Sequence, residues 1–313
     1  FVSLFFQGQP SRKRPERVDD LIDAALMARI GQLDVVSRKI FTGKIQGERR
    51  SKRRGQSVEF ADFRPYVHGD DLRFIDWNIF GRLDRLFLKI FLEEEDLSLV
   101  IAIDISASMD WGDPNKMVFA QRLAMALGYI GLVNHNRVTI AAFGGEGGLQ
   151  KISNLRGRRK TAEMGKWILN LQSGGTGTFE DSMKALALAR QGRGVMVVVS
   201  DFLLKEGYEK GLRYVAGRGY DLWCMQTLSP QEIDPSAHGL VGDWRLTDAE
   251  DRDEAEVTAS PGLVEQYRAN LGAWCAGLRD FAIRRSIMHM VVDTSTEVDA
   301  LLLEYLRQRG LVR

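Results

Sequence analysis

Three oxygen-bearing side chains stand at alternate positions directly after a long apolar run. Residues 99–103, LVIAI, are followed by Asp104, Ser106 and Ser108. A strand over 99–103 would carry Asp104 to its carboxyl end, where ligands bind in open α/β sheets, and a loop over that end can turn all three side chains toward one point. One carboxylate and two hydroxyls suit a hard cation, with Mg²⁺ as the expected ion and Mn²⁺ or Ca²⁺ as alternatives.

Two later segments offer further oxygen ligands at the same edge. The sequence GGTGT at 174–178 is a flexible loop that leads into a helical pattern and offers a third hydroxyl. The pair SD at 200–201 follows the apolar run VMVVV and offers a second carboxylate. Because ligand sites of parallel sheets lie outside the carboxyl ends of the strands, we expect these groups to converge. The alternative is that they only satisfy backbone donors at strand ends.

Enzyme chemistry fits the cluster less well than ion binding. Neither Ser106 nor Ser108 has the glycine framing of a nucleophile elbow, and the nearest histidine in sequence, His135, lies past the far end of the following helix. Aspartyl phosphotransfer needs a second acid two residues after the nucleophilic Asp104, where Ser106 stands. We therefore predict no catalytic residues. A metal-dependent phosphohydrolase that uses the same Asp and Ser cluster is the alternative.

The elements that must position these side chains alternate between apolar runs and helical patterns. Runs that are continuously apolar suit strands covered on both faces, so the alternation predicts a mostly parallel sheet flanked by helices. The runs are SLVIAI, RVTIAAF, VMVVVS, DLWCMQTL and IMHMVV. We predict four parts: a disordered or tag-derived leader over 1–17, an N-terminal helical segment over 18–42, a small β-rich lobe over 43–96, and an α/β domain over 97–313 with an acidic hairpin insert near 241–258.

Charge and composition limit the classes of partner. Lys and Arg number 43 against 42 Asp and Glu, so the overall field favours neither nucleic acid nor a membrane surface. The basic run ERRSKRR at 48–54 favours a solvated loop or protein contact patch, with nucleic-acid phosphates as the alternative. No apolar run approaches the roughly 20 residues of a membrane span, and no signal peptide is visible. We expect a cytoplasmic protein, with Cys224 and Cys275 as free thiols.

The segment GDDLRFIDW at 69–77 concentrates acids and an arginine among aromatic residues. Alternating Arg and Asp side chains on short strands form structural networks more often than catalytic pairs, because a buried charge requires a partner. We therefore expect this segment and the basic run to serve contacts between the lobes or with a partner. The residues concerned are Arg49, Arg50, Arg53, Asp70, Asp71, Arg73 and Asp76.

The order DxSxS, a threonine in a Gly-rich loop, and an aspartate after a later strand resembles the von Willebrand factor A domain and its metal-ion-dependent adhesion site (MIDAS). The resemblance implies a Rossmann-like α/β domain. It also implies that the bound ion keeps one coordination place free for an acidic side chain of a partner. The implied metal ligands, direct or through water, are Asp104, Ser106, Ser108, Thr176 and Asp201, with Thr178 as the alternative to Thr176.

A longer stretch, from RRSKRRGQSVEF through YVHGDDLRFIDW to DISASM, is similar to the bacterial family catalogued as domain of unknown function 58. The later WRLTDAED resembles a hairpin of that family. Members are commonly encoded beside MoxR-type AAA+ ATPases. The resemblance therefore implies a non-enzymatic, metal-dependent protein-binding module that acts as an adaptor or co-chaperone of such an ATPase or binds its client.

Overall fold

The computed structural model describes residues 4–6, 14–38, 59–68, 72–92, 97–175, 177–189, 194–238, 242–248 and 254–313. The chain divides into two units, one made of residues 1–46 with 97–313 and the other of residues 47–96. The larger unit contains the predicted α/β domain.

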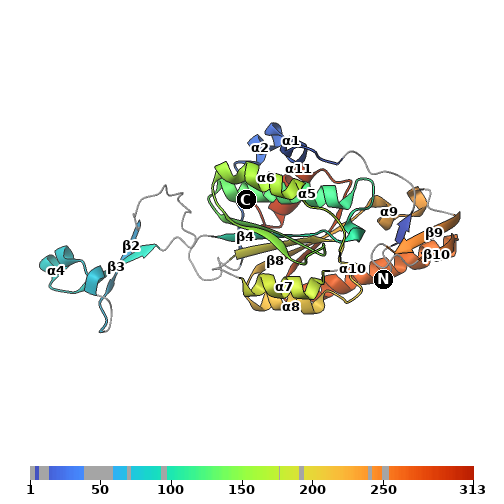
Figure 1. Cartoon of the computed structure of the whole chain (residues 1–313). Coiled ribbons are helices and arrows are strands. Elements are labelled where there is room, and N and C mark those ends of the chain that lie inside the picture. The colour runs from blue at the N-terminus through green and yellow to red at the C-terminus, as the bar shows by residue number, and fades with distance from the viewer. Residues whose placement is uncertain are drawn as a thin grey trace. The chain divides into compact units, whose positions relative to one another are not determined.

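A six-stranded sheet forms the centre of the larger unit (Figure 1). Its strand order is β11-β8-β7-β4-β5-β6, and all neighbouring strands are parallel except β6, which runs antiparallel to β5. The mostly parallel sheet predicted from the apolar runs is therefore confirmed. The strands are β4 (Ser98–Asp104), β5 (Arg137–Phe143), β6 (Gln150–Leu155), β7 (Gly194–Ser200), β8 (Asp221–Leu228) and β11 (Met288–Asp293).

Helices cover both faces of this sheet (Figure 1). One face carries α5 (Lys116–Val133), α6 (Thr161–Leu169), α1 (Val18–Leu21), α2 (Ala24–Ile30) and α11 (Val298–Ala300), and the other carries α7 (Phe179–Leu188), α8 (Glu209–Gly217) and α10 (Pro261–Ile283). Successive side chains of a strand point to opposite faces, which explains why β4 needs an unbroken apolar run. Leu99, Ile101 and Ile103 pack in one hydrophobic cluster, whereas Val100 and Ala102 pack in the other.

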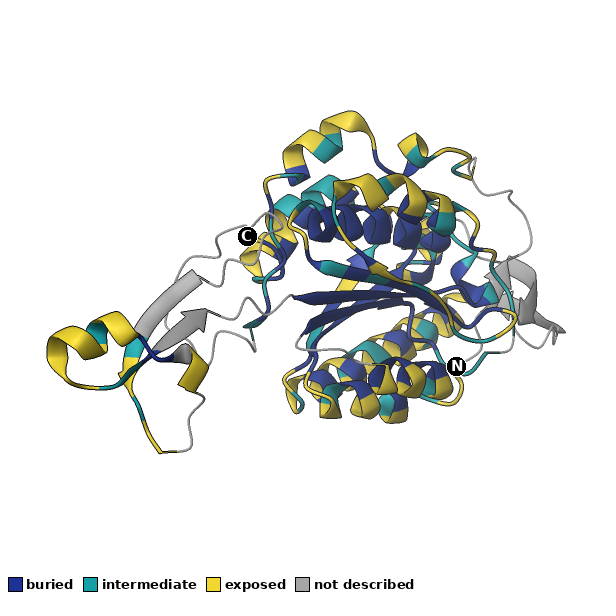
Figure 2. Ribbon diagram, turned by 60° about the vertical axis from the view of Figure 1, so that its left-hand side comes forward, coloured by how far each residue is buried: buried dark blue, intermediate teal, exposed yellow. Residues whose placement is uncertain are grey.

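Helix α5 lies deepest among the helices drawn in Figure 2, where it is almost wholly dark blue. Among the described helices it is the one that is long and apolar enough to cross a membrane by length and composition, but 83% of that window is buried inside the protein. It packs against β4 and β5, so its apolar composition is explained by the core of the larger unit.

The N-terminal residues differ from the prediction in two respects. The helical segment is split into α1 and α2, because the Asp23 side chain accepts a hydrogen bond from Leu26 N (2.6 Å) and caps a new helix. Leu4–Phe6 lies in the leader that was predicted to be disordered or tag-derived. It forms the strand β1, which pairs with β9, so these three residues are not disordered. Backbone hydrogen bonding lets even a three-residue segment join the edge of a sheet.

The acidic tract forms part of a second, three-stranded sheet. Strands β9 (Gly242–Asp248) and β10 (Glu254–Ala259) pair antiparallel, and β1 (Leu4–Phe6) adds to the other edge of β9. The remaining short elements of the larger unit are η2 (Ala107–Met109), η3 (Arg158–Lys160), α9 (Pro230–Ile233), η4 (Ser236–His238) and the π-helical η5 (Leu301–Leu306).

One described part of the lobe that was predicted to be β-rich is helical instead. Strands β2 (Glu59–Pro65) and β3 (Phe87–Leu92) pair antiparallel, but LRFIDWNIF forms the 3₁₀ helix η1 (Leu72–Phe74) and the helix α4 (Trp77–Leu83). The aromatic residues suggested strands, whereas Asp76 caps a helix by accepting hydrogen bonds from Asn78 N (2.8 Å) and Ile79 N (3.1 Å). The cap overrides the β propensity of the residues that follow it.

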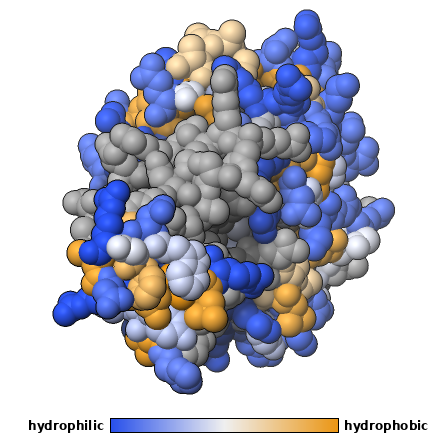
Figure 3. Space-filling model, turned by 90° about the vertical axis from the view of Figure 1, so that its left-hand side faces the viewer, coloured by the Kyte–Doolittle hydropathy of each residue, from blue (hydrophilic) through white to orange (hydrophobic). Residues whose placement is uncertain are grey.

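Helix α4 exposes apolar side chains. Trp77 and Leu83 are 63% and 60% exposed, and the rings of Trp77 and Phe80 meet edge to face with centroids 6.1 Å apart. Figure 3 shows one face of the molecule, where hydrophobic residues, in orange, lie at the surface among hydrophilic residues, in blue.

Candidate functional site

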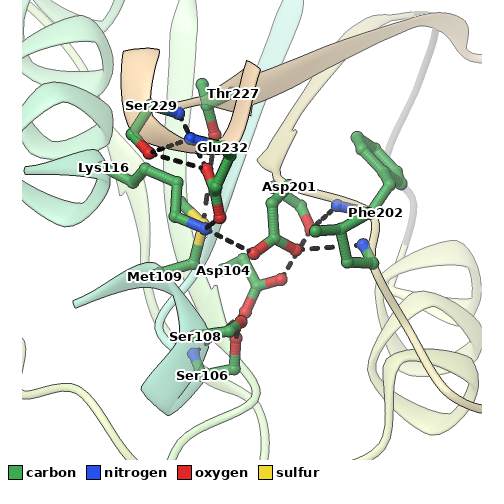
Figure 4. Close-up of polar contacts among 12 residues, drawn as sticks. Asp104, Ser106, Ser108, Met109, Lys116, Asp201, Phe202, Thr227, Ser229 and Glu232 are labelled. Carbon is green, nitrogen blue, oxygen red and sulfur yellow. Dashed lines mark hydrogen bonds and ion pairs between the residues drawn. The ribbon is translucent and has the colours of Figure 1, made fainter. Parts of the chain in front are cut away.

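The strand order places the predicted site at the point where the sheet changes direction. From β4 the chain continues outward to β5 and β6, and from β7 it continues in the opposite direction to β8 and β11. Open α/β sheets bind ligands outside the carboxyl ends of the strands at such a switch point. Asp104 is the last residue of β4, and Asp201 directly follows β7. Figure 4 shows their side chains close together, with Ser106 and Ser108 beside Asp104.

Asp104 is buried, with 1% of its surface exposed. Its Oδ1 accepts a hydrogen bond from Ser106 N (2.9 Å), and its Oδ2 accepts one from Ser200 Oγ (2.6 Å). Burial and the nearby charge of Asp201 raise the pKa of Asp104 to about 6, against the opposing effect of the Ser200 and Ser106 hydrogen bonds. The carboxylate is thus well hydrogen-bonded but electrostatically strained.

The two serines of the DxSxS pattern meet because the chain turns immediately after β4. Ser106 Oγ lies 3.0 Å from Ser108 Oγ, and both side chains are buried. Met109 N donates to Ser106 O (3.1 Å) and closes the turn of η2, the 3₁₀ helix in which Ser108 lies. The alternate spacing therefore places two hydroxyls next to Asp104.

The Gly-rich loop lies beside the loop that follows β4. Gly174 N donates to Ile105 O (2.9 Å), and Gly174 O accepts from Glu146 N (3.0 Å). Gly175 has φ 136°, and a Cβ at this residue would lie 2.1 Å from Glu146 N, so only glycine fits this approach. Thr176, the predicted threonine ligand, lies outside the described residues.

Thr178, the predicted alternative to Thr176, is the N-cap of α7. Its Oγ1 accepts a hydrogen bond from Asp181 N (3.2 Å) and donates one to Asp181 Oδ2 (2.7 Å). Both interactions are those of a helix cap, so the structure gives Thr178 a local structural role.

The end of β5 also contributes to the site. Phe143 O accepts a hydrogen bond from Ile105 N (2.8 Å), which continues the β4–β5 pairing beyond Asp104. Gly144 follows with φ 83°, and a Cβ there would lie 2.9 Å from Asp104 Oδ1. A glycine at this position leaves room for the Asp104 carboxylate.

Asp201 is as buried as Asp104 but has a cationic partner. Its Oδ1 accepts from Leu203 N (3.0 Å), and its Oδ2 pairs with Lys116 Nζ at 2.8 Å. Lys116 is fully buried and pairs as well with Glu232 Oε1 at 2.5 Å. Burial alone would lower the pKa of Lys116, but the two carboxylates outweigh burial and raise it above its ordinary value.

Glu232 is held at the start of α9 by a reciprocal capping arrangement with Ser229. Glu232 Oε2 accepts from Ser229 N (2.8 Å) and Ser229 Oγ (3.0 Å), while Ser229 Oγ accepts from Glu232 N (3.3 Å). Burial raises the pKa of Glu232, with Lys116 acting in the opposite direction. The glutamate therefore has a fixed place opposite the Lys116 ammonium.

Lys116, Glu232 and Ser200 were not among the predicted site residues. The sequence contains a signal for Glu232, since SPQE at 229–232 matches a capping box with proline at the first helical position. It contains only a faint signal for Lys116, a lone charge at the start of an apolar helix. Ser200 stands next to the predicted Asp201, but its hydrogen bond to Asp104 crosses between two strands.

The other predicted residues belong to the smaller unit, and the structure describes two of them. Asp76 caps α4, and Arg73 is an exposed residue of η1 within the smaller unit. The predictions for Arg49, Arg50, Arg53, Asp70 and Asp71 fall outside the described residues.

The donor set of the site is two carboxylates with neighbouring hydroxyls. Within the described ranges no group of three or more His, Cys, Asp or Glu side chains is arranged to hold a metal ion. Asp104 and Asp201 supply the charge, and Ser106 and Ser108 supply neutral oxygens. Hard cations with oxygen ligands match such a set, whereas zinc, which is bound by cysteine and histidine, does not.

Solved structures of other proteins resemble this chain only distantly. A conserved hypothetical protein, BatB, from Bacteroides thetaiotaomicron is 14% identical and aligns with a TM-score of 0.41 over 68% of this chain and 98% of its own. The PilB minor pilin from Streptococcus sanguinis is 11% identical, with a TM-score of 0.34 over 72% of this chain and 64% of its own.

Curated sequences and family models give a closer match. The uncharacterized proteins Rv1480 of Mycobacterium tuberculosis and Mb1516 of Mycobacterium bovis are each 25% identical to this chain over 253 residues, which is 79% of this chain and 78% of each relative. The model of the family described as protein of unknown function DUF58 matches residues 62–273, which include the loops after β4 and β7 and the capping box of α9. The chain therefore belongs to the DUF58 family.

Proposed function

We propose that residues 97–313 form a von Willebrand factor A-like domain whose MIDAS-type site binds Mg²⁺, or alternatively Mn²⁺ or Ca²⁺, and thereby binds an acidic side chain of a protein partner. The observation that carries the proposal is the burial of Asp104 and Asp201 side by side at the switch point of the sheet. Ser106 and Ser108 add hydroxyls at the same place.

The residues present suit a divalent cation on electrostatic grounds. Two carboxylates removed from water repel each other unless a cation lies close, and burial, together with this repulsion, raises the pKa of Asp104. In the part of the chain that the structure describes, Lys116 pairs with Asp201, whereas Asp104 has only hydroxyl and backbone donors. The ion would be held by Asp104, Ser106, Ser108 and Asp201, with Thr176 as the fifth ligand.

A bound ion would supply a positive centre that attracts a carboxylate. The chain's own residues would orient that centre, since Asp104 is fixed by Ser106 N and Ser200 Oγ and Asp201 by Leu203 N and Lys116 Nζ. This arrangement favours reversible binding of an acidic partner residue over turnover. The proposed function is therefore that of a non-enzymatic protein-binding module.

The proposed partner is a MoxR-type AAA+ ATPase or its client, with this chain as adaptor or co-chaperone. That part of the proposal rests on the family resemblance, because DUF58 members are commonly encoded beside such ATPases. Since an ATPase of this kind consumes ATP, we place the interaction in the cytoplasm.

The proposal is tested by measuring the affinity of the full chain for a MoxR-type ATPase encoded beside it. We expect binding in Mg²⁺ that is lost in chelator and in Asp104→Ala. Asp293→Asn is a matched control, because Asp293 also ends a strand, β11, that is three positions away in the sheet. The control should bind as the wild type does. Equal affinity with Mg²⁺, with chelator and in Asp104→Ala would overturn the proposal.

The alternative hypothesis, a metal-dependent phosphohydrolase, is distinguished from the adaptor proposal by measuring hydrolysis of a set of phosphate esters in Mg²⁺. We expect no turnover from the wild type. If the wild type hydrolyses a phosphate ester, and Asp104→Ala abolishes this activity while Asp293→Asn keeps it, the protein is an enzyme and the adaptor proposal is wrong.

A further inference from the structure

The buried ammonium of Lys116 joins the candidate cation site to a carboxylate outside the DxSxS pattern. Lys116 Nζ lies 2.8 Å from Asp201 Oδ2 and 2.5 Å from Glu232 Oε1, and its side chain has no exposed surface. Figure 4 shows the ammonium near these two carboxylates, with Asp104 next to Asp201. Any ion held by Asp201 would therefore share that carboxylate with Lys116.

An ammonium is kept in a protein interior only when its partners offset the loss of water. Removal of one partner from a buried ion pair leaves an uncompensated charge, which is strongly unfavourable. Asp201 alone would have to serve both Lys116 and the ion. Glu232 supplies a second carboxylate, and the hydrogen bonds from Ser229 N and Ser229 Oγ keep it in place.

The charges of the cluster match a divalent ion. Asp104, Asp201 and Glu232 carry three negative charges when ionised, and Lys116 carries one positive charge, so two negative charges remain. A divalent cation would balance them. Without the charge of Lys116 the cluster would carry three net negative charges, and without the charge of Glu232 it would carry one.

We propose that Lys116 and Glu232 are positioning residues that set the divalent-cation affinity of the Asp104–Asp201 site. They act through Asp201, whose negative charge Lys116 partly neutralises. Lys116 shares the Asp201 carboxylate with the ion and lowers the affinity, while Glu232 offsets Lys116 and raises it. This inference rests on the proposed function, since it assumes that the site binds a divalent cation.

The experiment is a calorimetric titration of the full chain with MgCl₂ after treatment with chelator. A second titration uses Mn²⁺, and its binding is measured by electron paramagnetic resonance. The variants are Lys116→Met, Glu232→Gln and the double variant. At the effective dielectric of a protein interior, a unit charge removed from the surroundings of a carboxylate that would hold a divalent ion should change the ion's affinity by about tenfold or more. We expect Glu232→Gln to weaken Mg²⁺ binding and Lys116→Met to tighten it, each by that factor.

The double variant restores the net charge and should bind Mg²⁺ within about threefold of the wild type, on the same electrostatic argument. An exposed pair, Lys160 and Glu163 at 2.6 Å, provides matched controls. Lys160→Met and Glu163→Gln make the same chemical changes where solvent screens them, and should leave the affinity unchanged.

The outcomes separate this inference from the proposed function. If the wild type binds neither Mg²⁺ nor Mn²⁺, both fall. If the wild type binds but Lys116→Met and Glu232→Gln both weaken the affinity or both leave it unchanged, the residues have a merely structural role and this inference alone is overturned. If Lys116→Met does not fold, Glu232→Gln and the double variant decide: a weakened single variant with a restored double variant supports the inference, and any other pattern overturns it.

Discussion

The ends of β4 and β7 provide a comparison within one sheet. Asp104 and Asp201 follow neighbouring parallel strands and are each 1% exposed. Asp201 has an ammonium at 2.8 Å, whereas Asp104 has hydrogen bonds from a hydroxyl and a backbone N–H. Asp201 also accepts a hydrogen bond from Leu203 N. Among the described residues, the two equally buried carboxylates therefore differ in that Asp201 has an ion pair as well as a hydrogen bond, whereas Asp104 has hydrogen bonds alone.

The difference identifies the end of β4 as the side of the site that lacks a cation among the described residues. Hydrogen bonds lower the pKa of Asp104, but they do not compensate for burial and for the charge of Asp201. The end of β7 is already neutralised in part by Lys116. An added cation would therefore stabilise the β4 end more than the β7 end.

The largest effect is expected at the β7 end, from Lys116→Met in chelator. The change leaves Asp201 and Glu232 buried without their cation, so we expect the free energy of unfolding to fall by about 3–5 kcal/mol, the usual cost of breaking a buried pair. Urea unfolding followed by circular dichroism measures it. Lys166→Met, at an exposed position of α6, should change it by no more than about 0.5 kcal/mol. If Lys116→Met lowers the free energy of unfolding as little as the control variant does, the ion pair does not stabilise Asp201, and the proposed difference between the ends of β4 and β7 is wrong.

The second prediction concerns pH and the β4 end. Asp104 has a pKa of about 6 in the folded chain against an ordinary 3.8, so the folded state binds the proton more tightly than the unfolded state. The protonated Asp104 therefore contributes to the stability of the folded state. This stabilisation is fully present below pH 3.8 and is lost as the pH rises through about 6. At about 1.4 kcal/mol per pKa unit, the loss is about 3 kcal/mol.

Urea unfolding of the wild type and Asp104→Asn in chelator, between pH 3.5 and 7, tests this prediction. We expect the wild type to lose stability relative to Asp104→Asn as the pH rises through this range, and Mg²⁺ to restore it. Parallel pH profiles for the two proteins would mean that Asp104 is not electrostatically strained.

The smallest effect distinguishes the two threonines of the Gly-rich loop. Thr178→Ala removes the cap of α7 and should lower the free energy of unfolding by about 1 kcal/mol, with Mg²⁺ affinity unchanged. Thr176→Ala should weaken Mg²⁺ binding, as expected of a ligand. Calorimetric titration and urea unfolding of both variants give the comparison. Loss of Mg²⁺ binding in Thr178→Ala would assign the ligand role to Thr178 instead.

Local sequence succeeded where a single physical requirement dominates, and failed where two compete. The strands β4, β7 and β8 were predictable because burial on both faces demands an unbroken apolar run. The predicted β-rich lobe over 43–96 includes LRFIDWNIF, whose aromatic and β-branched residues favour strands, yet Asp76 caps a helix there. Propensity and capping favoured different structures, and the cap prevailed.

The sequence by itself determined which carboxylates reach the switch point, because a side chain at the end of a parallel strand or directly after it must lie at the carboxyl end of that strand. Asp104 and Asp201 were placed in this way. Only the tertiary structure decided their charge environment. Lys116 and Glu232 are 116 residues apart and lie on different helices, and no local pattern specifies which buried charges will meet. Ion pairing in the interior depends on packing between distant elements, so it follows from the fold.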